Sequence, residues 1–540
     1  MLRPSPIIRL TAQDKGSAKV RRRWAAEAQI GMRDNLTRLL SRRLLSSRRL
    51  SSRLQPSRLL FPRVPSGAIL SRALLAASLL VSGCDTMSNL SNKVFGASNP
   101  PEGQPGHVQG FLGGVAADEP RAALIARDVL SQGGNAADAA VALGFALSVT
   151  LPSRAGLGGG GACMAFAPGA KSVNAGVPEA VLFSPAAAAG GPNADRPAAV
   201  PLLARGLYLL HARYGHLPFG SLIVPAEQMA RFGTPVTRSL AQDLAVVGGP
   251  LLADPTAATI FGRGGSPLTE GQPIVQPALA STLAQLRTVG VGDFYQGALA
   301  HRIADASVAA GGPLTMADLR DALPRLAVPI EIDYRDDKLA FLPPPADGGL
   351  AAAAAFQALQ HDPSAPAAAQ ARANAVVARW RATGGDPKAL LAADLPVGGL
   401  PPLPASTSFI TIDHDGNAVA CALTMDNLFG TGRVLADTGL LLAASPAAVP
   451  PPELAAAIVW NEPTHAFRAA VAGSGQEAAG TAVAVAAYNT LRTGQAMSAP
   501  VPDPGRANVG ACSQYLPDGE ASCRWATDPR GAGLAIGSNK

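Results

Sequence analysis

The sequence has few of the features that metal- and nucleotide-dependent enzymes need. Its seven histidines are scattered without an HExxH pair, and its five cysteines have no spacing that matches a zinc site. The glycine-rich run at 156–161 lacks the lysine of a P-loop and the GxGxxG spacing of a dinucleotide site. We therefore expect no metal and no cofactor, and we interpret these glycines as close backbone packing at the start of a buried strand.

Charged residues are scarce, at 15% of the chain, and the basic ones gather at the N-terminus. Residues 1–72 contain 17 Lys and Arg against 3 Asp and Glu, which leaves 28 basic and 35 acidic residues in the rest. The net charge of +7 therefore comes from the leader, and we expect no nucleic-acid partner. The leader is either a basic arm or, as we favour, the result of a start codon placed too far upstream.

The apolar run at 73–81 is too short to cross a bilayer, which needs about 20 residues. Basic residues precede it and small residues follow it, as in a secretory signal. The sequence VSGC that ends at Cys84 resembles a bacterial lipobox, which implies cleavage before Cys84 and lipidation of its thiol. The alternative is a buried core helix that contains a cysteine.

These features divide the N-terminal part of the chain. We expect residues 1–83 to be a basic leader with a lipoprotein-type signal, and residues 84–106 to be a flexible tether. A lipid on Cys84 would anchor the protein in the bacterial cell envelope, facing the periplasm. Asp85, directly after the cysteine, suggests retention at the inner membrane.

Export would permit disulfides, because the bacterial periplasm is oxidising. Cys512 and Cys523 flank the turn-rich segment SQYLPDGEAS, and we predict that they pair. Cys163 and Cys421 lie in apolar runs, so we interpret them as small buried hydrophobic residues.

Regular structure can be predicted for most of the chain after residue 106. Asp118, followed by Pro120, is expected to cap one helix, and Asn135 to cap the next, whose many small residues predict tight packing. Further helices are predicted at 200–245, 277–321 and 349–380, a strand at 338–345 and a loop at 385–405. From residue 409 the pattern changes to strands, at 409–412 and 418–424.

The Asp-Gly pair at 415–416 predicts a hairpin between these two strands. With a two-residue turn, Thr407 would lie opposite Thr424, and Ser406 opposite Met425. Directly opposed residues have Cβ atoms about 5 Å apart. We therefore expect the hydroxyl groups of Ser406, Thr407 and Thr424 to cluster at one end of the hairpin.

Five segments resemble the γ-glutamyltransferase (γ-glutamyl transpeptidase) family and occur in the family's order. They are GGNAADAAVALGFALSVTLPSRAGLGGGGACMAF, ARYGHLPFGSLIVPAEQMARFGTPVT, FYQGALAHRIADASVAAGGPLTMADL, FLPPPADGGL and SFITIDHDGNAVACALTMDNLFGTGRVLADTGLLL. The resemblance implies the N-terminal-nucleophile hydrolase fold, an α+β four-layer αββα sandwich. It also implies a precursor that cleaves itself into a large-subunit-like region, 107–405, and a small-subunit-like region, 406–540, which together form one domain.

The resemblance implies that Ser406 is the nucleophile, because the family's nucleophile stands seven residues before the Asp that precedes the turn. Cleavage would then fall between Ala405 and Ser406, and a one-residue shift would select Thr407 instead. A hydroxyl is a weak nucleophile that needs a base. The α-amine freed by cleavage has a reference pKa of about 7.7–8.0 and can serve as that base.

Other site residues also follow from the resemblance. Thr424 matches a second hydroxyl that positions the nucleophile. Gly473, Ser474 and Gly475 resemble the start of the family's glycine-rich oxyanion loop, whose backbone N–H groups would stabilise a tetrahedral anion. Asp426 aligns with an Asn that helps to bind the amino end of the substrate.

The substrate end departs from the family pattern. An arginine that grips the substrate carboxylate is expected near residues 176–179, and the segment VNAGVPEAV contains none. The paired serines expected before the oxyanion loop are replaced by the apolar stretch AAAIVWN. Losing an arginine that matches a carboxylate in geometry as well as charge is a large change.

Two functions remain open. The first is an amidohydrolase or transferase that acts on glutathione-like γ-glutamyl compounds or on other N-acyl amides, with a large and a small subunit after self-cleavage. The second is a catalytically degenerate family member that serves as an envelope lipoprotein scaffold or binding module.

Overall fold

The computed structural model describes residues 100–169, 172–191, 193–395, 405–497 and 503–537. The predicted leader and signal, Cys84 and most of the predicted tether lie outside the described residues. In the part of the chain that the structure describes, no helix combines the length and the apolar character that a membrane span requires.

A seven-stranded antiparallel sheet contains the predicted hairpin at its centre. In spatial order its strands are β10 (Arg325–Ala327), β3 (Glu179–Phe183), β2 (Gly160–Phe166), β14 (Ala418–Thr424), β13 (Ser406–Asp413), β1 (Gly113–Ala117) and β21 (Leu534–Gly537). Every residue of β13 and β14 is buried, as expected of central strands that are covered on both faces.

A second, six-stranded sheet packs on the first. Its order is β11 (Ile330–Tyr334), β12 (Asp337–Phe341), β17 (Ala455–Asn461), β18 (Ala466–Ser474), β19 (Arg506–Leu516) and β20 (Cys523–Thr527). One apolar cluster contains inward residues of both sheets, such as Ile410 and Ala420 from the first and Ile458 and Ala470 from the second. This cluster is the core between the two sheets.

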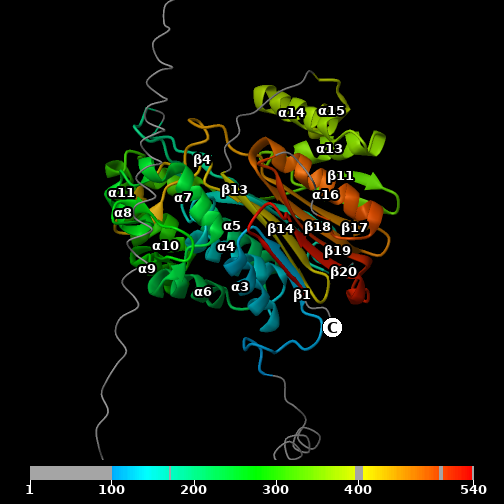
Figure 1. Cartoon of the computed structure of the whole chain (residues 1–540), viewed down its shortest axis with the longest axis horizontal. Helices are drawn as coiled ribbons and strands as arrows, with labels where there is room; N and C mark the ends of the chain where they lie inside the picture. Colours follow the sequence, from blue (N-terminus) through cyan, green and yellow to red (C-terminus); the bar gives the residue numbers. More distant parts are fainter. Residues whose placement is uncertain (1–99, 170–171, 192, 396–404, 498–502, 538–540) are drawn as a thin grey trace, which may run out of the picture. The chain divides into compact units, whose positions relative to one another are not determined.

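Helices cover the outer face of each sheet (Figure 1). On the seven-stranded sheet, α3 (Pro120–Ser131), α4 (Ala136–Thr150) and α5 (Leu203–Tyr214) share an apolar cluster with outward residues of β13 and β14. On the six-stranded sheet, a second apolar cluster joins α13 (Gly348–His361), α14 (Pro366–Thr383) and α16 (Ala479–Thr493) to outward residues of β17, β18 and β19. The four layers confirm the predicted αββα fold.

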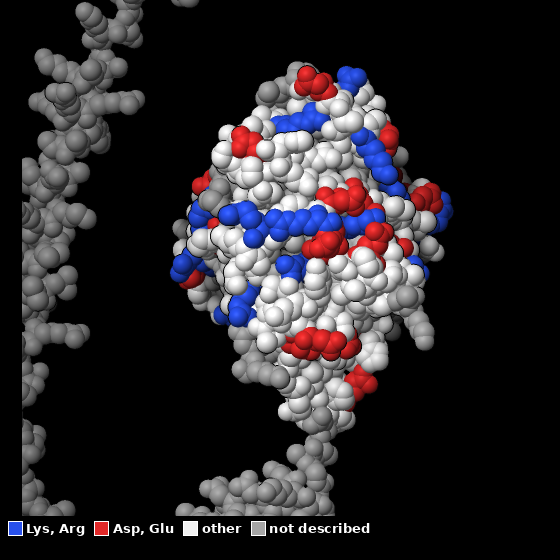
Figure 2. All heavy atoms as spheres, turned by 90° about the vertical axis from the view of Figure 1, so that its right-hand side faces the viewer, with Lys and Arg blue, Asp and Glu red and all other residues white. Residues whose placement is uncertain are grey.

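The remaining elements surround this sandwich. They are α6 (Phe219–Phe232), α7 (Arg238–Leu251), α8 (Pro255–Phe261), α9 (Pro277–Val289), α10 (Val291–Gln296), α11 (Ala298–Ala309), α12 (Met316–Asp321), α15 (Pro387–Ala392), the 3₁₀ turns Gln476–Ala478 and Glu520–Ser522, and the two-residue strands β4 (Ala186–Ala187), β5 (Ala199–Val200), β6 (Thr234–Pro235), β7 (Gly262–Arg263), β8 (Ser266–Pro267), β9 (Pro273–Ile274), β15 (Val434–Leu435) and β16 (Leu440–Leu441). On the face shown in Figure 2, Lys and Arg are interspersed with Asp and Glu.

Three local predictions need correction. Asn135 caps α4 through a capping box, as predicted, but the cap of α3 is Glu119 rather than Asp118. The predicted helix at 349–380 is two helices, since Pro366 begins α14 after a break. The predicted loop at 385–405 contains α15, where Asp386 is the cap and Pro387 occupies the first turn.

The hairpin register differs from the prediction by one residue. Ser406 lies opposite Thr424, and Thr407 lies opposite Leu423. The turn has three residues instead of two, and Gly416, at φ +85°, takes the left-handed conformation that completes such a loop. The shift brings Ser406 itself, rather than Thr407, directly across from Thr424.

The glycine run packs as predicted. A Cβ on Gly158 would lie 2.1 Å from the Leu441 carbonyl oxygen, and one on Gly159 would lie 2.2 Å from the Thr424 carbonyl oxygen. A Cβ on Gly161 would lie 2.5 Å from the Ala422 carbonyl oxygen. These glycines are required for the close approach of β2 to its neighbours.

Two disulfides lie in the sheets. Cys512 is bonded to Cys523 across β19 and β20. Cys163 and Cys421 are buried, as predicted, but they are also bonded to each other across β2 and β14, which the interpretation as small hydrophobic residues missed. They are 258 residues apart in sequence, and only the pairing of β2 with β14 brings them together.

Candidate active site

Ser406 occupies the first position of β13, in the middle of the seven-stranded sheet. In the uncut chain its side chain is fully buried. The backbone N–H of Gly475 donates to Ser406 Oγ at 3.3 Å. The hydroxyl is thus held against the turn that follows β18, where the sequence placed the oxyanion loop.

The carbonyl group of Ala405, directly before Ser406, has two donors. The hydroxyl of Thr424 donates to the Ala405 oxygen at 2.9 Å, and the N–H of Met425 approaches it at 3.5 Å. The N–H of Ala405 donates to Gln476 Oε1 at 3.3 Å. Donors aimed at a carbonyl oxygen stabilise the negative charge that develops when the carbon is attacked. The arrangement therefore suits attack by Ser406 on its own preceding peptide bond.

Thr407 lies on the opposite face of β13, since successive side chains alternate along a strand. Its hydroxyl donates to Asp118 Oδ2 at 3.1 Å, and not to any group of the scissile peptide. Between the two candidate nucleophiles, the geometry favours Ser406.

Asp118 is the main site residue that sequence reasoning missed. Its carboxylate accepts from Thr407, from the Ser408 N–H at 2.8 Å, from the Ser474 hydroxyl at 2.9 Å and from Asn508 Nδ2 at 2.8 Å. It follows β1, which pairs with β13, and so it reaches both the nucleophile strand and the loop after β18. The sequence offered only a polar residue before a helix, which led us to expect a cap.

The three predicted oxyanion residues have different roles. Only Gly475, which adopts φ +108°, donates to Ser406 Oγ. The hydroxyl of Ser474 turns instead to Asp118. Gly473 lies at a close contact, because a Cβ there would lie 2.6 Å from the Ala479 carbonyl oxygen. Asp118 therefore fixes Ser474, and through it the position of the neighbouring N–H donor.

Asp426 is a buried carboxylate with no hydrogen-bond partner on either oxygen among the described residues. It is 1% exposed, has a left-handed backbone at φ +59°, and its N–H donates to Thr424 Oγ1 at 2.8 Å. Burial raises the pKa of Asp426 well above its ordinary value. A protonated carboxyl has one acceptor and one donor on its two oxygens, much as an amide has on its O and N.

The place expected for the family arginine needs correction. In the structure Glu179 pairs with Ala165, whereas Phe183 pairs with Gly161, next to Gly160, which lies opposite Thr424. Residues 176–179 are therefore at the far end of the sheet from Ser406. The chain that reaches the Ser406 end is the segment after Phe183, Ser-Pro-Ala-Ala, and it contains no arginine either.

Glu453 is a second buried carboxylate that the sequence did not reveal. It precedes β17, and its Oε2 accepts from the N–H of Gly480 in α16 at 3.2 Å. Burial, followed by the nearby Asp347, raises the pKa of Glu453 well above its ordinary value. It lies two residues before the stretch AAAIVWN, where the family pattern led us to expect paired serines.

Metal-ligating side chains come together at one place among the described residues, the hairpin turn. One ligand atom each from Asp413, His414 and Asp415 lies within 4.8 Å of the others. The carboxylate of Asp413 already accepts from the N–H of Ala136 at 3.0 Å and from Asn417 Nδ2 at 2.8 Å. Its role is to join the turn to the start of α4.

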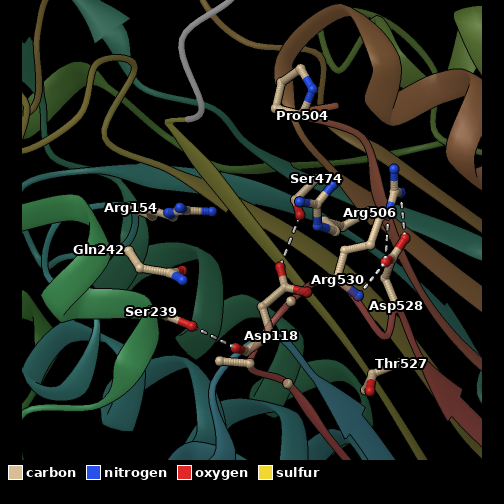
Figure 3. Close-up of a pocket in the computed structure, with 13 residues that line it drawn as sticks. Asp118, Arg154, Ser239, Gln242, Ser474, Pro504, Arg506, Thr527, Asp528 and Arg530 are labelled. Atoms are coloured by element: carbon tan, nitrogen blue, oxygen red, sulfur yellow. Dashed lines mark hydrogen bonds and ion pairs between the residues drawn. The ribbon is translucent and has the colours of Figure 1, made fainter. Parts of the chain in front are cut away.

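A cavity of about 110 Å³ opens beside the nucleophile strand (Figure 3). Arg154 and Gln242 lie on one side of it, Ser474 and Arg506 on the other, and Asp118 between them. Its charged and polar lining consists of Asp118, Arg154, Ser239, Gln242, Ser474, Arg506, Thr527, Asp528 and Arg530. We call it the arginine cavity.

Comparisons with known proteins find similar sequences among hydrolases made as proenzymes. The family model for gamma-glutamyltranspeptidase matches residues 122–380. The glutathione hydrolase proenzyme of Escherichia coli (strain K12) is 29% identical over 415 residues, which cover 65% of this chain and 71% of that protein. The acylase ACY 1 proenzyme of Pseudomonas sp. (strain SE83) is 32% identical over 260 residues, 45% of this chain and 47% of that protein.

A solved structure shares the fold. The cephalosporin acylase of Bacillus halodurans superposes with a TM-score of 0.65, covering 79% of this chain and 96% of its own. Sequence identity in that comparison is 21%, so it shows the fold alone.

Proposed function

The chain belongs to the γ-glutamyltranspeptidase family, whose relatives are hydrolases made as proenzymes, and from this we propose that it cuts itself between Ala405 and Ser406 and then cleaves γ-glutamyl or other N-acyl amides. The observation that carries the proposal is the pair of donors on the Ala405 carbonyl, directly beside a held serine hydroxyl.

Self-cleavage would begin with attack of Ser406 Oγ on the Ala405 carbonyl carbon. The hydroxyl proton passes to the peptide nitrogen, the carbon–nitrogen bond breaks, and an ester joins Ala405 to Ser406. Thr424 and the N–H of Met425 stabilise the intermediate oxyanion. Water then hydrolyses the ester, which leaves a carboxylate on Ala405 and a free α-amine on Ser406.

The freed α-amine would act as the base for the second reaction. It takes the proton of Ser406 Oγ as that oxygen attacks the substrate carbonyl, and it returns the proton to the amine that leaves. The acyl group is then carried on Ser406 as an ester. Water resolves this ester in hydrolysis, and a second amine resolves it in transfer.

The substrate is an amide of small size. Glutathione hydrolases and an acylase are both among the relatives, so γ-glutamyl amides and other N-acyl amides are the two substrate classes to test. Neither residues 176–179 nor residues 184–187, which directly follow β3, contain an arginine that could bind a γ-glutamyl carboxylate.

The test is the mass of the purified protein under denaturing, reducing conditions, together with the hydrolysis of acyl anilides. We expect two fragments, the smaller beginning at Ser406, and release of the aniline from a γ-glutamyl or simple acyl anilide. An uncut chain that hydrolyses none of them would reject the enzyme and favour the scaffold or binding module.

We also propose that Cys84 carries a lipid that anchors the protein in the inner membrane of the bacterial envelope, facing the periplasm. This rests on the VSGC sequence after a short apolar run. Labelling of cells with a radioactive fatty acid should mark the protein, and Cys84→Ala should remove the label. Label that persists in the variant would contradict the anchor.

A further inference from the structure

We propose that the arginine cavity binds the charged amino-acid end of the substrate, where an ammonium and a carboxylate occur together. The proposal rests on the proposed function and names the substrate class of that site. Because the arginine expected from the family pattern is absent, other residues would bind the polar end of the substrate.

The cavity adjoins the reaction centre. Ser474 lines it and directly precedes Gly475, whose N–H lies 3.3 Å from Ser406 Oγ. Asp118, also in the lining, accepts hydrogen bonds from the two residues that follow Ser406. The cavity therefore lies next to residues that contact Ser406 and its strand, while Ser406 itself is buried behind them.

Two arginines face each other across the cavity (Figure 3). Arg154 uses Nε and Nη2 for a two-point contact with Asp243, at 2.8 and 2.6 Å, and Nη1 has no partner among the described residues. Arg506 uses Nη1 for Asp503 at 2.6 Å and for the Gly505 carbonyl, and its Nε and Nη2 have no partner within the described ranges. Both can still donate to a carboxylate.

The lining of the arginine cavity also contains acidic side chains. They favour a ligand that carries both a positive and a negative charge over a simple anion. Asp118 lies between the arginines, and Asp528 lies beside Arg530. A simple anion would be attracted by the arginines and repelled by Asp118. An amino-acid group can place its carboxylate at the arginines and its ammonium at Asp118, so that each charge meets an opposite one.

Substitution of Arg506 tests the cavity. We compare the wild type, Arg506→Gln and, as a matched control on the neighbouring strand, Arg524→Gln, which contacts only backbone carbonyls. The first readout is binding of L-glutamate and of glutarate, which lacks the ammonium, by calorimetry. The second is the KM for γ-glutamyl anilide and for butyryl anilide, which lacks both charges.

We expect Arg506→Gln to weaken glutamate binding and to raise the KM for γ-glutamyl anilide by about 10- to 100-fold, the effect of one charge-assisted hydrogen bond. Glutarate should bind the wild type more weakly than glutamate does. Arg524→Gln should bind both compounds as the wild type does. Arg506→Gln should still cleave itself, and its KM for butyryl anilide should equal that of the wild type.

Wild-type protein that binds neither compound, or an Arg506→Gln variant that binds glutamate as the wild type does, would overturn the proposal. Because binding is measured without turnover, it decides on the cavity even if the protein cleaves no anilide. Failure of self-cleavage would instead contradict the proposed function.

A separate observation carries a second proposal: we infer that the Cys163–Cys421 disulfide joins the two fragments covalently after self-cleavage. Cys163 precedes the bond between Ala405 and Ser406 in the chain, and Cys421 follows it. The other disulfide, Cys512–Cys523, lies wholly within the second fragment. Cleavage would therefore give two chains held together by one bond.

The link lies close to the reacting groups. Cys421 and Thr424 are both on β14, and Cys163 is on β2, whose first residue, Gly160, lies opposite Thr424. Both cysteines are fully buried, so a reductant reaches them only when the sheet opens. The bond thus fixes β2 of the first fragment to the strand that carries Thr424 in the second.

The test uses protein isolated from an oxidising compartment with its free thiols alkylated. We expect one species with the combined mass of both fragments without reductant, and two fragments after reduction. Cys163→Ser should give two fragments without reductant. Peptide mapping should find Cys163 linked to Cys421 whether or not the chain is cut, and alkylated Cys163 and Cys421 would overturn the proposal.

Discussion

The two sides of the nucleophile strand hold an aspartate in opposite ways. Toward β1, Asp118 accepts hydrogen bonds from Thr407, Ser408, Ser474 and Asn508 and lines an open cavity. Toward β14, Asp426 is sealed from solvent with no partner for its carboxylate among the described residues. Burial without donors raises the pKa of Asp426 and favours its neutral form, whereas Asp118 is held by hydrogen bonds from four residues.

The two sides of β13 therefore contribute different groups to the candidate site. The β1 side organises the loop that contacts Ser406 and offers charges to a ligand. On the β14 side, the Thr424 hydroxyl donates to the Ala405 carbonyl and accepts from the backbone N–H of Asp426. Substitutions on the two sides should therefore affect different measurements.

The largest effect is expected at Ser406 itself. Ser406→Ala removes the attacking oxygen and should abolish self-cleavage and hydrolysis, since no acyl-enzyme can form. Thr407→Ala removes one hydrogen bond to Asp118 and should slow hydrolysis by about tenfold at most. Fragment masses under reducing conditions and initial rates measure both. A fragment that begins at Thr407 would reverse the assignment.

Thr424→Ala should have the next largest effect. It removes the 2.9 Å donor to the Ala405 carbonyl, and losing one such donor typically costs about 10²- to 10³-fold in rate. Thr424→Ser keeps the hydroxyl and should cleave at nearly the wild-type rate. The decay of the uncut chain with time gives these rates, and equal decay in both variants would exclude Thr424 as the donor.

Asp118→Asn should lower kcat by about 10- to 100-fold, because an NH₂ group would face donors that now meet a charged oxygen. The exposed Asp128→Asn on α3 is the control. Hydrolysis of the uncharged butyryl anilide is the measurement, since this substrate does not depend on charges in the arginine cavity. A rise in KM alone would mean that Asp118 does not position the oxyanion loop.

The smallest effect is expected from Asp426→Asn, and it should depend on pH. Burial raises the pKa of Asp426 in the folded chain, whereas in the unfolded chain this carboxyl has a pKa of about 3.9. Its contribution to stability is therefore full below that pH and is lost as pH rises through the folded pKa. The wild type should therefore lose stability relative to Asp426→Asn as the pH rises from the unfolded pKa toward the raised folded pKa.

Denaturant unfolding of both proteins in a Ser406→Ala background, which keeps the chain intact, measures this difference. The exposed Asp437→Asn serves as the control and should follow the wild type. Parallel pH profiles for the wild type and Asp426→Asn would show that Asp426 stays ionised.

Local sequence signals predicted most helices and strands, but they did not predict the contacts between distant segments. The capping residue Asn135 and the close-packed glycines were predictable because each depends on neighbours in the chain or on residue size. The hairpin was predictable, but its register was not, because Asp-Gly fits both a two-residue and a three-residue turn. Asp118 and Glu453 went unnoticed because their partners are far away in sequence.

The amino-acid sequence predicted the resemblance to the γ-glutamyltransferase family, the αββα fold and Ser406 as the candidate nucleophile, and it shows that residues 176–179 contain no arginine. Those features rest on local patterns and on the order of motifs. The contacts between distant segments came from the folded chain: Ser406 lies opposite Thr424, Asp118 accepts from Ser474 beside it, and Cys163 is bonded to Cys421. Strand pairing sets these contacts, and pairing joins residues up to 258 positions apart, a distance over which no local pattern carries information.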